Sequence, residues 1–182
     1  QTVTKYNFTP KGFWENKILD WEQGRYGDQS ARTQFLERWA NRSSDSLRFR
    51  LTIAKSILIP HVAGKRVVEI GCGSGLLAED ILAAGAQSYL GIDIADAAIA
   101  SAQARFENSQ WHDAIQFRQG EVTDLPDDPA DIIFSLGLLD WLSDEEMDKL
   151  FNHYAGCDFL HAISERRFSI SQLVHRLYCL IS

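Results

Sequence analysis

The chain has 182 residues, with a hydrophobic fraction of 45% and a charged fraction of 24%, values typical of one compact globular domain with a sizeable core. Its formal net charge of -7 at pH 7 argues against a general affinity for phosphate backbones, so no nucleic-acid partner is expected. No apolar run approaches the roughly 20 residues that a membrane helix needs, and no signal peptide is visible in a sequence that begins at Gln1. We therefore expect no membrane partner.

The three cysteines are Cys72, Cys157 and Cys179. Their odd number and wide spacing predict neither a disulfide framework nor a zinc site, so no metal is expected. A reducing, cytoplasmic location fits this cysteine usage best. Cys72 lies within a glycine turn, and we interpret it as a small side chain tolerated there rather than as a nucleophile.

The first part of the chain, residues 1–43, is polar and aromatic and is too small to form its own core. The residue pattern of this part predicts helices over about 12–22 and 31–40, and we expect them to pack as a lid over the main domain. Residues 44–182 form that domain, which opens with a helix from about Ser44 to His61.

From Lys65 onward, apolar strand patterns alternate with helical patterns. The expected strands are Arg66–Ile70, Ser88–Asp93, about Ile115–Gln119, Asp131–Ser135 and about Asp158–Ser164. This alternation predicts an α/β fold: a doubly wound, mostly parallel sheet with helices on both faces and right-handed crossovers.

Four helices are expected among and after these strands. The first covers Leu76–Ala83, and the second has Asp96 as its N-cap and runs to about Glu107. The third opens with a capping box at Ser143 and runs to about Ala155. The last is an amphipathic segment over Ser169–Ile181.

The most informative stretch runs from Val67 to Gly75, where a β-branched run ends in three alternate glycines and a helix follows. Glycines allow a sharp turn and let a ligand approach the backbone closely. The pattern is typical of the first unit of a nucleotide-binding α/β fold. The second strand ends in Asp93, whose carboxylate can accept hydrogen bonds from both hydroxyls of a ribose.

Four motifs in this order resemble the class I S-adenosylmethionine (SAM)-dependent methyltransferases. They are VVEIGCGSG at 67–75, GIDIAD at 91–96, QGEVTDLP at 119–126 and DIIFSLGLLDWL at 131–142. The resemblance covers about residues 45–165. It implies a Rossmann-like methyltransferase fold with SAM as cofactor and S-adenosylhomocysteine as product.

The resemblance also implies which residues hold the methionine end of SAM. Glu69 is expected to hold the amino group, and the carbonyl region of Ser135 is expected to contact it as well. The backbone of the turn is expected to line the methionine portion, through Gly71, Cys72, Gly73 and Gly75.

The adenosine end of SAM is assigned by the same resemblance. Asp93 is expected to bind the ribose, and Ile94 to pack on the adenine. Glu121 occupies a position where the family often has an Asp that contacts the adenine amino group. The amide of Val122 is expected to reach an adenine ring nitrogen.

The nearest rival ligand is NAD, which would make the chain an oxidoreductase. A dinucleotide fingerprint requires G-x-G-x-x-G, but the third glycine position is occupied by Leu76. Glu69 also places a carboxylate near the position of a pyrophosphate. SAM has no phosphate and carries positive charge, so the acidic residues favour it, and the oxidoreductase is the least favoured function.

Methyl transfer from SAM needs no nucleophilic side chain, because the sulfonium already activates the methyl carbon and positioning supplies much of the acceleration. An acceptor hydroxyl or amine can need a base. By position alone, the candidates are Asp140, after the fourth strand, and Glu165, just past the fifth. The stretch from Ser135 to Leu138 lacks the Asn/Asp-Pro-Pro-aromatic motif of the family's base-amino methyltransferases, so we expect a small-molecule acceptor of unidentified structure.

After the fifth strand only Ser164–Ser182 remain, so the last two strands of the family's seven-stranded sheet are expected to be absent. Either the chain is a fragment, or a second copy or a partner chain covers the exposed edge. The missing region often shapes the acceptor pocket. A SAM-binding domain without catalysis of its own is therefore the alternative function.

Overall fold

The computed structural model describes residues 12, 15 and 49–163. Apart from Gly12 and Glu15, the predicted lid 1–43 lies outside these residues. So do the last predicted helix, Ser169–Ile181, and Glu165. Residues 49–58 are helical, as predicted for this part of the segment from Ser44 to His61, but residues Ile59–His61 form a 3-10 turn, η1, instead of continuing the helix.

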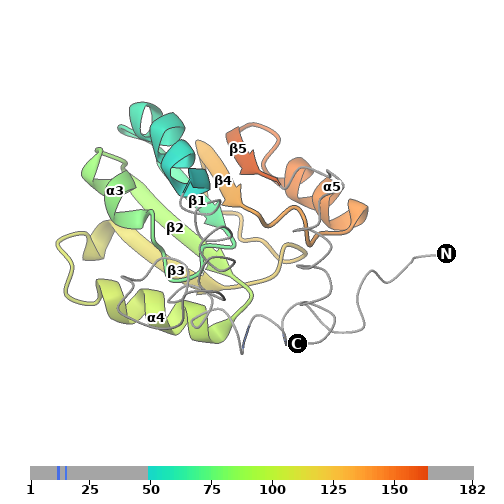
Figure 1. Cartoon of the computed structure of the whole chain (residues 1–182), viewed down its shortest axis with the longest axis horizontal. Coiled ribbons are helices and arrows are strands. Elements are labelled where there is room, and N and C mark those ends of the chain that lie inside the picture. The colour runs from blue at the N-terminus through green and yellow to red at the C-terminus, as the bar shows by residue number, and fades with distance from the viewer. Residues whose placement is uncertain (1–11, 13–14, 16–48, 164–182) are drawn as a thin grey trace, which may run out of the picture.

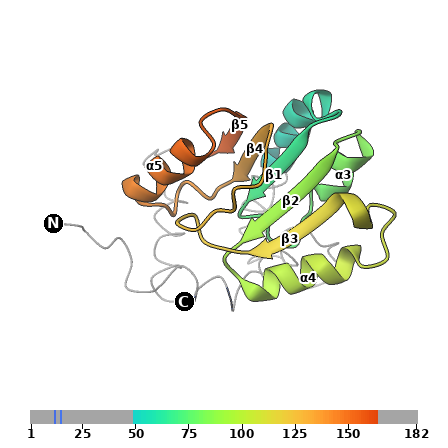
Figure 2. The ribbon, with the colours of Figure 1, turned by 180° about the vertical axis from the view of Figure 1, so that it is seen from behind.

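Five parallel strands form one sheet in the order β3-β2-β1-β4-β5 (Figures 1 and 2). The strands are β1 (Arg66–Ile70), β2 (Ser88–Asp93), β3 (Ile115–Gln119), β4 (Ile132–Leu136) and β5 (Asp158–Ala162). The prediction of a doubly wound parallel sheet is confirmed. Only β4, which begins and ends one residue later, and β5, which ends two residues earlier, depart from the expected bounds.

The helices after β1, β2 and β4 are α3 (Ala78–Ala83), α4 (Asp96–Phe106) and α5 (Asp144–His153), and a 3-10 turn, η2 (His112–Ala114), precedes β3. The capping box of α5 is confirmed. The Glu146 amide donates to the Ser143 hydroxyl at 3.3 Å, and the Ser143 amide donates to the Glu146 carboxylate at 2.8 Å.

The prediction that Asp96 caps α4 is wrong. Ala95 is the N-cap, and it has no side chain that can accept a hydrogen bond from the helix. Asp96 is already the first helical residue, and its amide donates to the carboxylate of Glu15. The missing cap is thus supplied from the distant N-terminal region, which local sequence cannot indicate.

Helices cover both faces of the sheet (Figures 1 and 2). Helix 49–58, α3 and α4 pack on the face that carries Val67 and Phe134, whereas α5 packs on the face that carries Val68 and Ile133. Successive side chains of a strand point to opposite faces, so strands buried on both sides need continuous apolar runs. Within residues 12, 15 and 49–163, no helix is long and apolar enough to cross a membrane.

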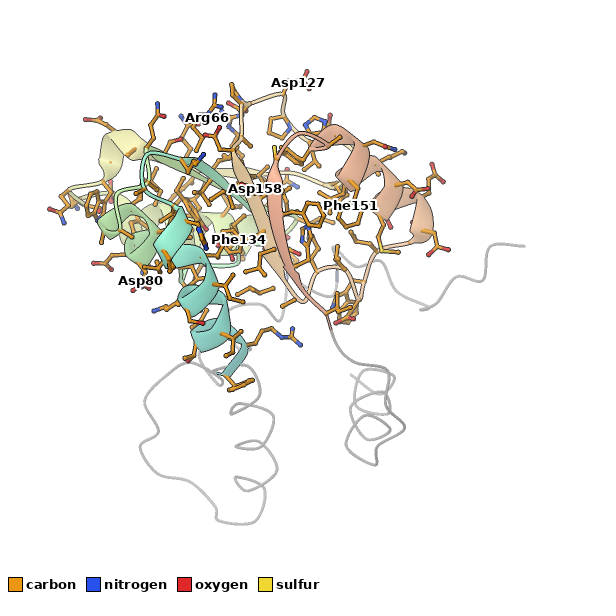
Figure 3. The ribbon with its side chains drawn as sticks, turned by 90° about the horizontal axis from the view of Figure 1, so that it is seen from above. Arg66, Asp80, Asp127, Phe134, Phe151 and Asp158 are labelled. Atoms are coloured by element: carbon orange, nitrogen blue, oxygen red, sulfur yellow. The ribbon has the colours of Figure 1, made fainter. Side chains whose placement is uncertain are left out.

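One ion pair fastens the amino ends of β1 and β4, where Figure 3 labels Arg66. The Arg66 side chain donates to both carboxylate oxygens of Asp131, at 2.9 and 2.8 Å, and the Arg66 amide donates at 2.8 Å. These hydrogen bonds hold the pKa of Asp131 well below its usual range. Asp131 therefore has a structural role just before β4, far from the carboxyl edge of the sheet.

Close packing against Phe117 explains two glycines near the glycine turn. A Cβ on Gly75 would lie 2.7 Å from the Phe117 ring, and a Cβ on Gly91 would lie 2.8 Å from that ring and 2.8 Å from Cys72 Sγ. Gly75 also has φ of 71°, in the left-handed region that favours glycine. The turn is therefore seated directly on the aromatic core.

We expect Gly75→Ala to destabilise the fold more than Gly64→Ala. The two glycines have nearly the same φ, 71° and 70°, so the backbone penalty is similar, about 1 kcal/mol. A Cβ on Gly64 meets nothing within 4 Å, whereas at Gly75 it meets Phe117. Overpacking should add about 1–3 kcal/mol at Gly75, measured by urea unfolding. Equal losses in the two variants would contradict this packing.

Candidate functional site

The candidate site lies at the carboxyl edge of the sheet, where the strand order changes direction. β1 pairs with β2 on one side and with β4 on the other. The helices α3 and α4, which follow β1 and β2, pack on one face of the sheet, whereas α5, which follows β4, packs on the opposite face. In open parallel sheets, ligands bind in the crevice at this switch point. The predicted site residues that the structure describes lie near the carboxyl ends of β1, β2, β3 and β4 or in the segments that follow them.

The glycine turn after β1 is tied to β2 by its own backbone. The amides of Gly71 and Cys72 both donate to the carbonyl of Ile92, at 2.7 and 3.1 Å, and the Gly75 amide donates to the Cys72 carbonyl at 3.0 Å. Gly71 is exposed and has φ of 75°. The turn is therefore held in place by hydrogen bonds to β2 and within itself. Its exposed residue Gly71 has no side chain that would block a ligand.

Asp93, the last residue of β2, joins the glycine turn to the start of α4. Its carboxylate accepts from the Gly73 amide at 2.8 Å and from the Ala95 amide at 3.0 Å, one on each oxygen. The residue is 8% exposed. Burial raises the pKa of Asp93, and the backbone hydrogen bonds oppose that shift. A carboxylate has about four acceptor positions, so two bonds leave capacity for a ligand's hydroxyls.

Glu69 lies in β1, two residues before Gly71, and is 4% exposed. The hydroxyl of Tyr89, in β2, donates to its carboxylate. Burial, reinforced by the neighbouring Glu69, raises the pKa of Tyr89 well above its ordinary value. Tyr89 thus remains a neutral donor at any physiological pH, and it supports a carboxylate that is otherwise costly to bury.

The residues predicted for the adenosine end follow β2 and β3, beside Asp93. The Gly120 amide donates to the Asp93 carbonyl at 2.9 Å, which fixes the start of the segment after β3. Ile94 and Val122 are half-buried, whereas Glu121 is exposed. The structure therefore brings Ile94, Glu121 and Val122 to the same side of the edge as Asp93.

On the other side of the switch point, Ser135 is completely buried, and its hydroxyl forms a hydrogen bond of 2.8 Å with Nδ1 of His161 in β5. Burial lowers the pKa of His161, so the ring is neutral at pH 7. Asp140 lies half-buried in the segment after β4.

Sequence reasoning missed two charged residues at this edge. One is Glu15, which contacts the start of α4. The other is Arg50, in helix 49–58: a Cβ on Gly137 would lie 2.5 Å from its Nη1. Gly137, with φ of 87°, thus leaves room for a guanidinium beside the segment that carries Asp140. The sequence shows a glycine after β4, but it does not show that the side chain of Arg50, 87 residues earlier, lies beside this glycine.

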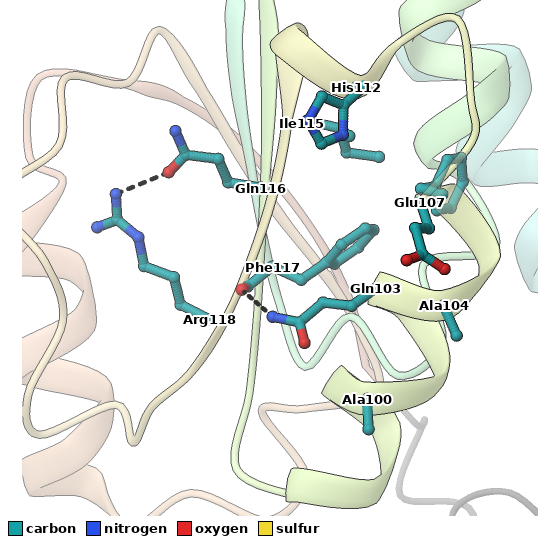
Figure 4. A pocket seen from close by; sticks show the side chains of 10 residues that line it. Ala100, Gln103, Ala104, Glu107, His112, Ile115, Gln116, Phe117 and Arg118 are labelled. Atoms are coloured by element: carbon teal, nitrogen blue, oxygen red, sulfur yellow. Dashed lines mark hydrogen bonds between the residues drawn. The ribbon is translucent and has the colours of Figure 1, made fainter.

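A cavity of about 660 Å³ lies away from this edge, between α4 and β3 (Figure 4). Its lining includes Gln103, whose side-chain amide donates to the Phe117 carbonyl at 3.2 Å. None of the predicted site residues lines it. Within the described part of the chain, no three His, Cys, Asp or Glu side chains gather in a way that could hold a metal ion.

Comparisons with known proteins agree with this geometry. A family described as "Methyltransferase domain" matches residues 67–157, half of the chain. Curated relatives include the ubiquinone biosynthesis O-methyltransferases of Acinetobacter baylyi, 35% identical over 86 residues (46% of this chain and 35% of the relative), and of Aromatoleum aromaticum, 48% identical over 50 residues (27% and 21%). The matches thus span about a third or less of the length of these relatives.

Solved structures show the same fold. Magnesium protoporphyrin IX methyltransferase (ChlM) from Synechocystis PCC 6803, with bound S-adenosylhomocysteine (SAH), superposes on this chain with a TM-score of 0.68 at 18% identity. The superposition covers 92% of this chain and 76% of that one. A SAM-dependent methyltransferase from Mesorhizobium loti gives a TM-score of 0.52 at 24% identity, over 62% of this chain and 52% of that one.

The switch-point edge, the glycine turn and the acidic end of β2 define a Rossmann-like fold of the class I SAM-dependent methyltransferase type. With half of its length matched, the chain belongs to the methyltransferase domain family.

We expect Tyr89→Phe to lower the free energy of unfolding by about 1–3 kcal/mol, because it removes a hydrogen bond to a buried carboxylate. Tyr154→Phe is the matched control: the Tyr154 hydroxyl is buried without a hydrogen-bond partner, so its loss should be neutral or stabilising. Urea unfolding at pH 7 measures both. A Tyr89→Phe protein as stable as the wild type would contradict a supporting role for Tyr89.

Proposed function

We propose that this protein binds SAM at the carboxyl edge of the sheet and transfers its methyl group to a small-molecule acceptor. The observation that carries the proposal is the position of Asp93. Its carboxylate is buried at the switch point, bonded to Gly73 and Ala95, and retains acceptor capacity. That is the arrangement that a ribose diol requires next to a glycine turn.

The hydrogen bonds of the turn favour a ligand without phosphate. A pyrophosphate site needs backbone amides that point at the ligand. Here the amides of Gly71 and Cys72 donate to Ile92, that of Gly73 to Asp93, and that of Gly75 to Cys72. These amides are committed within the protein, which supports SAM over NAD.

The charges of the site also fit SAM, which has a sulfonium, an ammonium and a carboxylate. We infer that Glu69 stabilises the ammonium end, directly or through water, and that the guanidinium of Arg50 lies within reach of the carboxylate. Opposite charges at these two positions would orient the methionine portion along the edge. Asp93 would then hold the ribose, with Ile94, Glu121 and Val122 around the adenine.

The bound cofactor would supply a methyl carbon that the sulfonium already activates. The contribution of the protein is to hold donor and acceptor in line, which is worth on the order of 7–11 kcal/mol in well-aligned reactions. Asp140, in the segment after β4, is proposed to accept the proton of the acceptor as its oxygen or nitrogen is methylated. Glu165 is the second candidate for this role.

An oxygen acceptor is the more specific form of the proposal. Its support is the name of the curated relatives, which are O-methyltransferases. A hydroxyl also needs the base that Asp140 would provide. We further propose a cytoplasmic location, supported by the odd number and wide spacing of Cys72, Cys157 and Cys179, which do not suggest a disulfide framework.

A SAM-binding domain without independent catalysis is the second candidate. It is favoured by the short coverage of the curated relatives, of which the aligned part is 35%. We also infer that a second copy or a partner chain covers the β5 edge in the working assembly. This is supported by Phe159 and Ile163, which are 64% and 62% exposed there.

Calorimetric titration tests cofactor binding. We expect the wild-type protein to bind SAM and its demethylated product, and Asp93→Ala to weaken both at least tenfold, because the ribose loses its acceptor. Asp113→Ala, which removes the same charge from an exposed residue, should bind like the wild type. Preferential binding of NAD, or unchanged SAM affinity in Asp93→Ala, would refute the proposed site.

Turnover tests the base. With a panel of phenols, alcohols and amines as acceptors, we expect Asp140→Asn to lower product formation by roughly 10²–10⁴-fold and to leave the dissociation constant of SAM unchanged. Methylation at an unaltered rate would remove Asp140 from the mechanism. Cofactor binding without product from any acceptor would favour the non-catalytic candidate.

A further inference from the structure

Glu15 provides the side-chain cap that α4 lacks. Its carboxylate accepts from the Asp96 amide at 3.0 Å and from the Ala97 amide at 3.2 Å. The first amides of a helix have no partner within the helix, and a negative charge is stabilised there. Glu15 is 81 residues before Asp96, so this cap is a tertiary contact.

The same turn also holds Asp93. The Ala95 amide donates to Asp93 Oδ1, and the next two amides donate to Glu15. Three successive amides, at residues 95–97, are therefore divided between two carboxylates. The negative charge of Glu15 adds to the burial that raises the pKa of Asp93, so the two carboxylates lie close enough to influence each other.

We propose that Glu15 is a cofactor-positioning residue, which secures the turn between β2 and α4 and thereby keeps Asp93 oriented for the ribose. This inference rests on the proposed function, because it assigns to Glu15 a part in binding the same cofactor. Glu15 acts through Asp93 and the amides of α4.

Glu15 would act by accepting hydrogen bonds from two amides that could otherwise bond to Asp93. If the Glu15 carboxylate were absent, the amides of Asp96 and Ala97 would donate to water or compete for the Asp93 oxygens. Asp93 would then have more than one favourable orientation, and fixing it on binding would cost affinity. With Glu15 present, each oxygen of Asp93 has one fixed backbone donor and its other acceptor positions stay available.

The titratable groups around Asp93 allow a specific pH test. Tyr89 in β2 stays neutral and donates to Glu69 of β1, Cys72 lies in the glycine turn, and Asp96 opens α4. These groups are common to all variants, so their effects cancel. Only ionised Asp93 accepts from both ribose hydroxyls, so affinity is lost as pH falls through its pKa. Removing the charge of Glu15 lowers that pKa and moves the loss to lower pH.

The experiment is a titration of the full chain with S-adenosylhomocysteine from pH 4.5 to 8, using Glu15→Ala, Glu15→Gln and the control Glu107→Gln. Glu107 is an exposed acid at the opposite end of α4. At pH 7.5 we expect Glu15→Ala to weaken binding roughly fivefold, the scale of a lost cap. Glu15→Gln keeps an acceptor oxygen and should weaken it about twofold.

The midpoint of the acid loss of affinity is the decisive measurement. In Glu15→Gln this midpoint should lie at lower pH than in the wild type and in Glu107→Gln, because the charge that raises the pKa of Asp93 is gone. Unchanged affinity in Glu15→Ala, or an unchanged midpoint in Glu15→Gln, overturns the positioning role. If Glu15→Ala fails to fold, Glu15→Gln alone decides. Failure of the wild type to bind overturns the proposed function instead.

Discussion

A buried carboxylate at the end of β2 organises the carboxyl edge of this sheet. Asp93 accepts from Gly73 on one side and from Ala95 on the other, so the glycine turn and the start of α4 share one anchor. Burying a charge is costly unless hydrogen bonds compensate it. The two amides provide that compensation, and they favour the ionised form of the carboxylate at the carboxyl edge of the sheet. The turn, the helix and the proposed cofactor site therefore depend on the same two contacts.

The packing below the turn makes this geometry rigid. Phe117 of β3 contacts Phe106 of α4 with ring centroids 5.5 Å apart, and it leaves no room for a Cβ on Gly75 or Gly91. The glycines thus serve the core as much as the ligand. Because the turn is already bonded to Ile92 and seated on the aromatic core, binding needs little backbone rearrangement. Preformed sites of this kind avoid the entropy cost of ordering a loop.

The sequence predicted the local features and missed the distant ones. The strands were recognisable because a parallel sheet buried on both faces needs continuous apolar runs, and the capping box at Ser143 is complete within four residues. The cap of α4 was misassigned because its acceptor, Glu15, is far away in the chain. The same holds for Arg50 beside Gly137. The bond between Ser135 and His161 depends on the register of β4 with β5, which a single sequence does not contain.

The two edges of the described sheet differ in a way that bears on self-association. At β3, the side chain of Gln103 occupies the Phe117 carbonyl, so an incoming strand would have to displace it. At β5, apolar side chains such as Phe159 face the solvent. A strand edge that offers both backbone and apolar contacts is a template for further pairing. An additional strand would therefore be opposed at β3, whereas at β5, among the described residues, it would meet exposed apolar side chains.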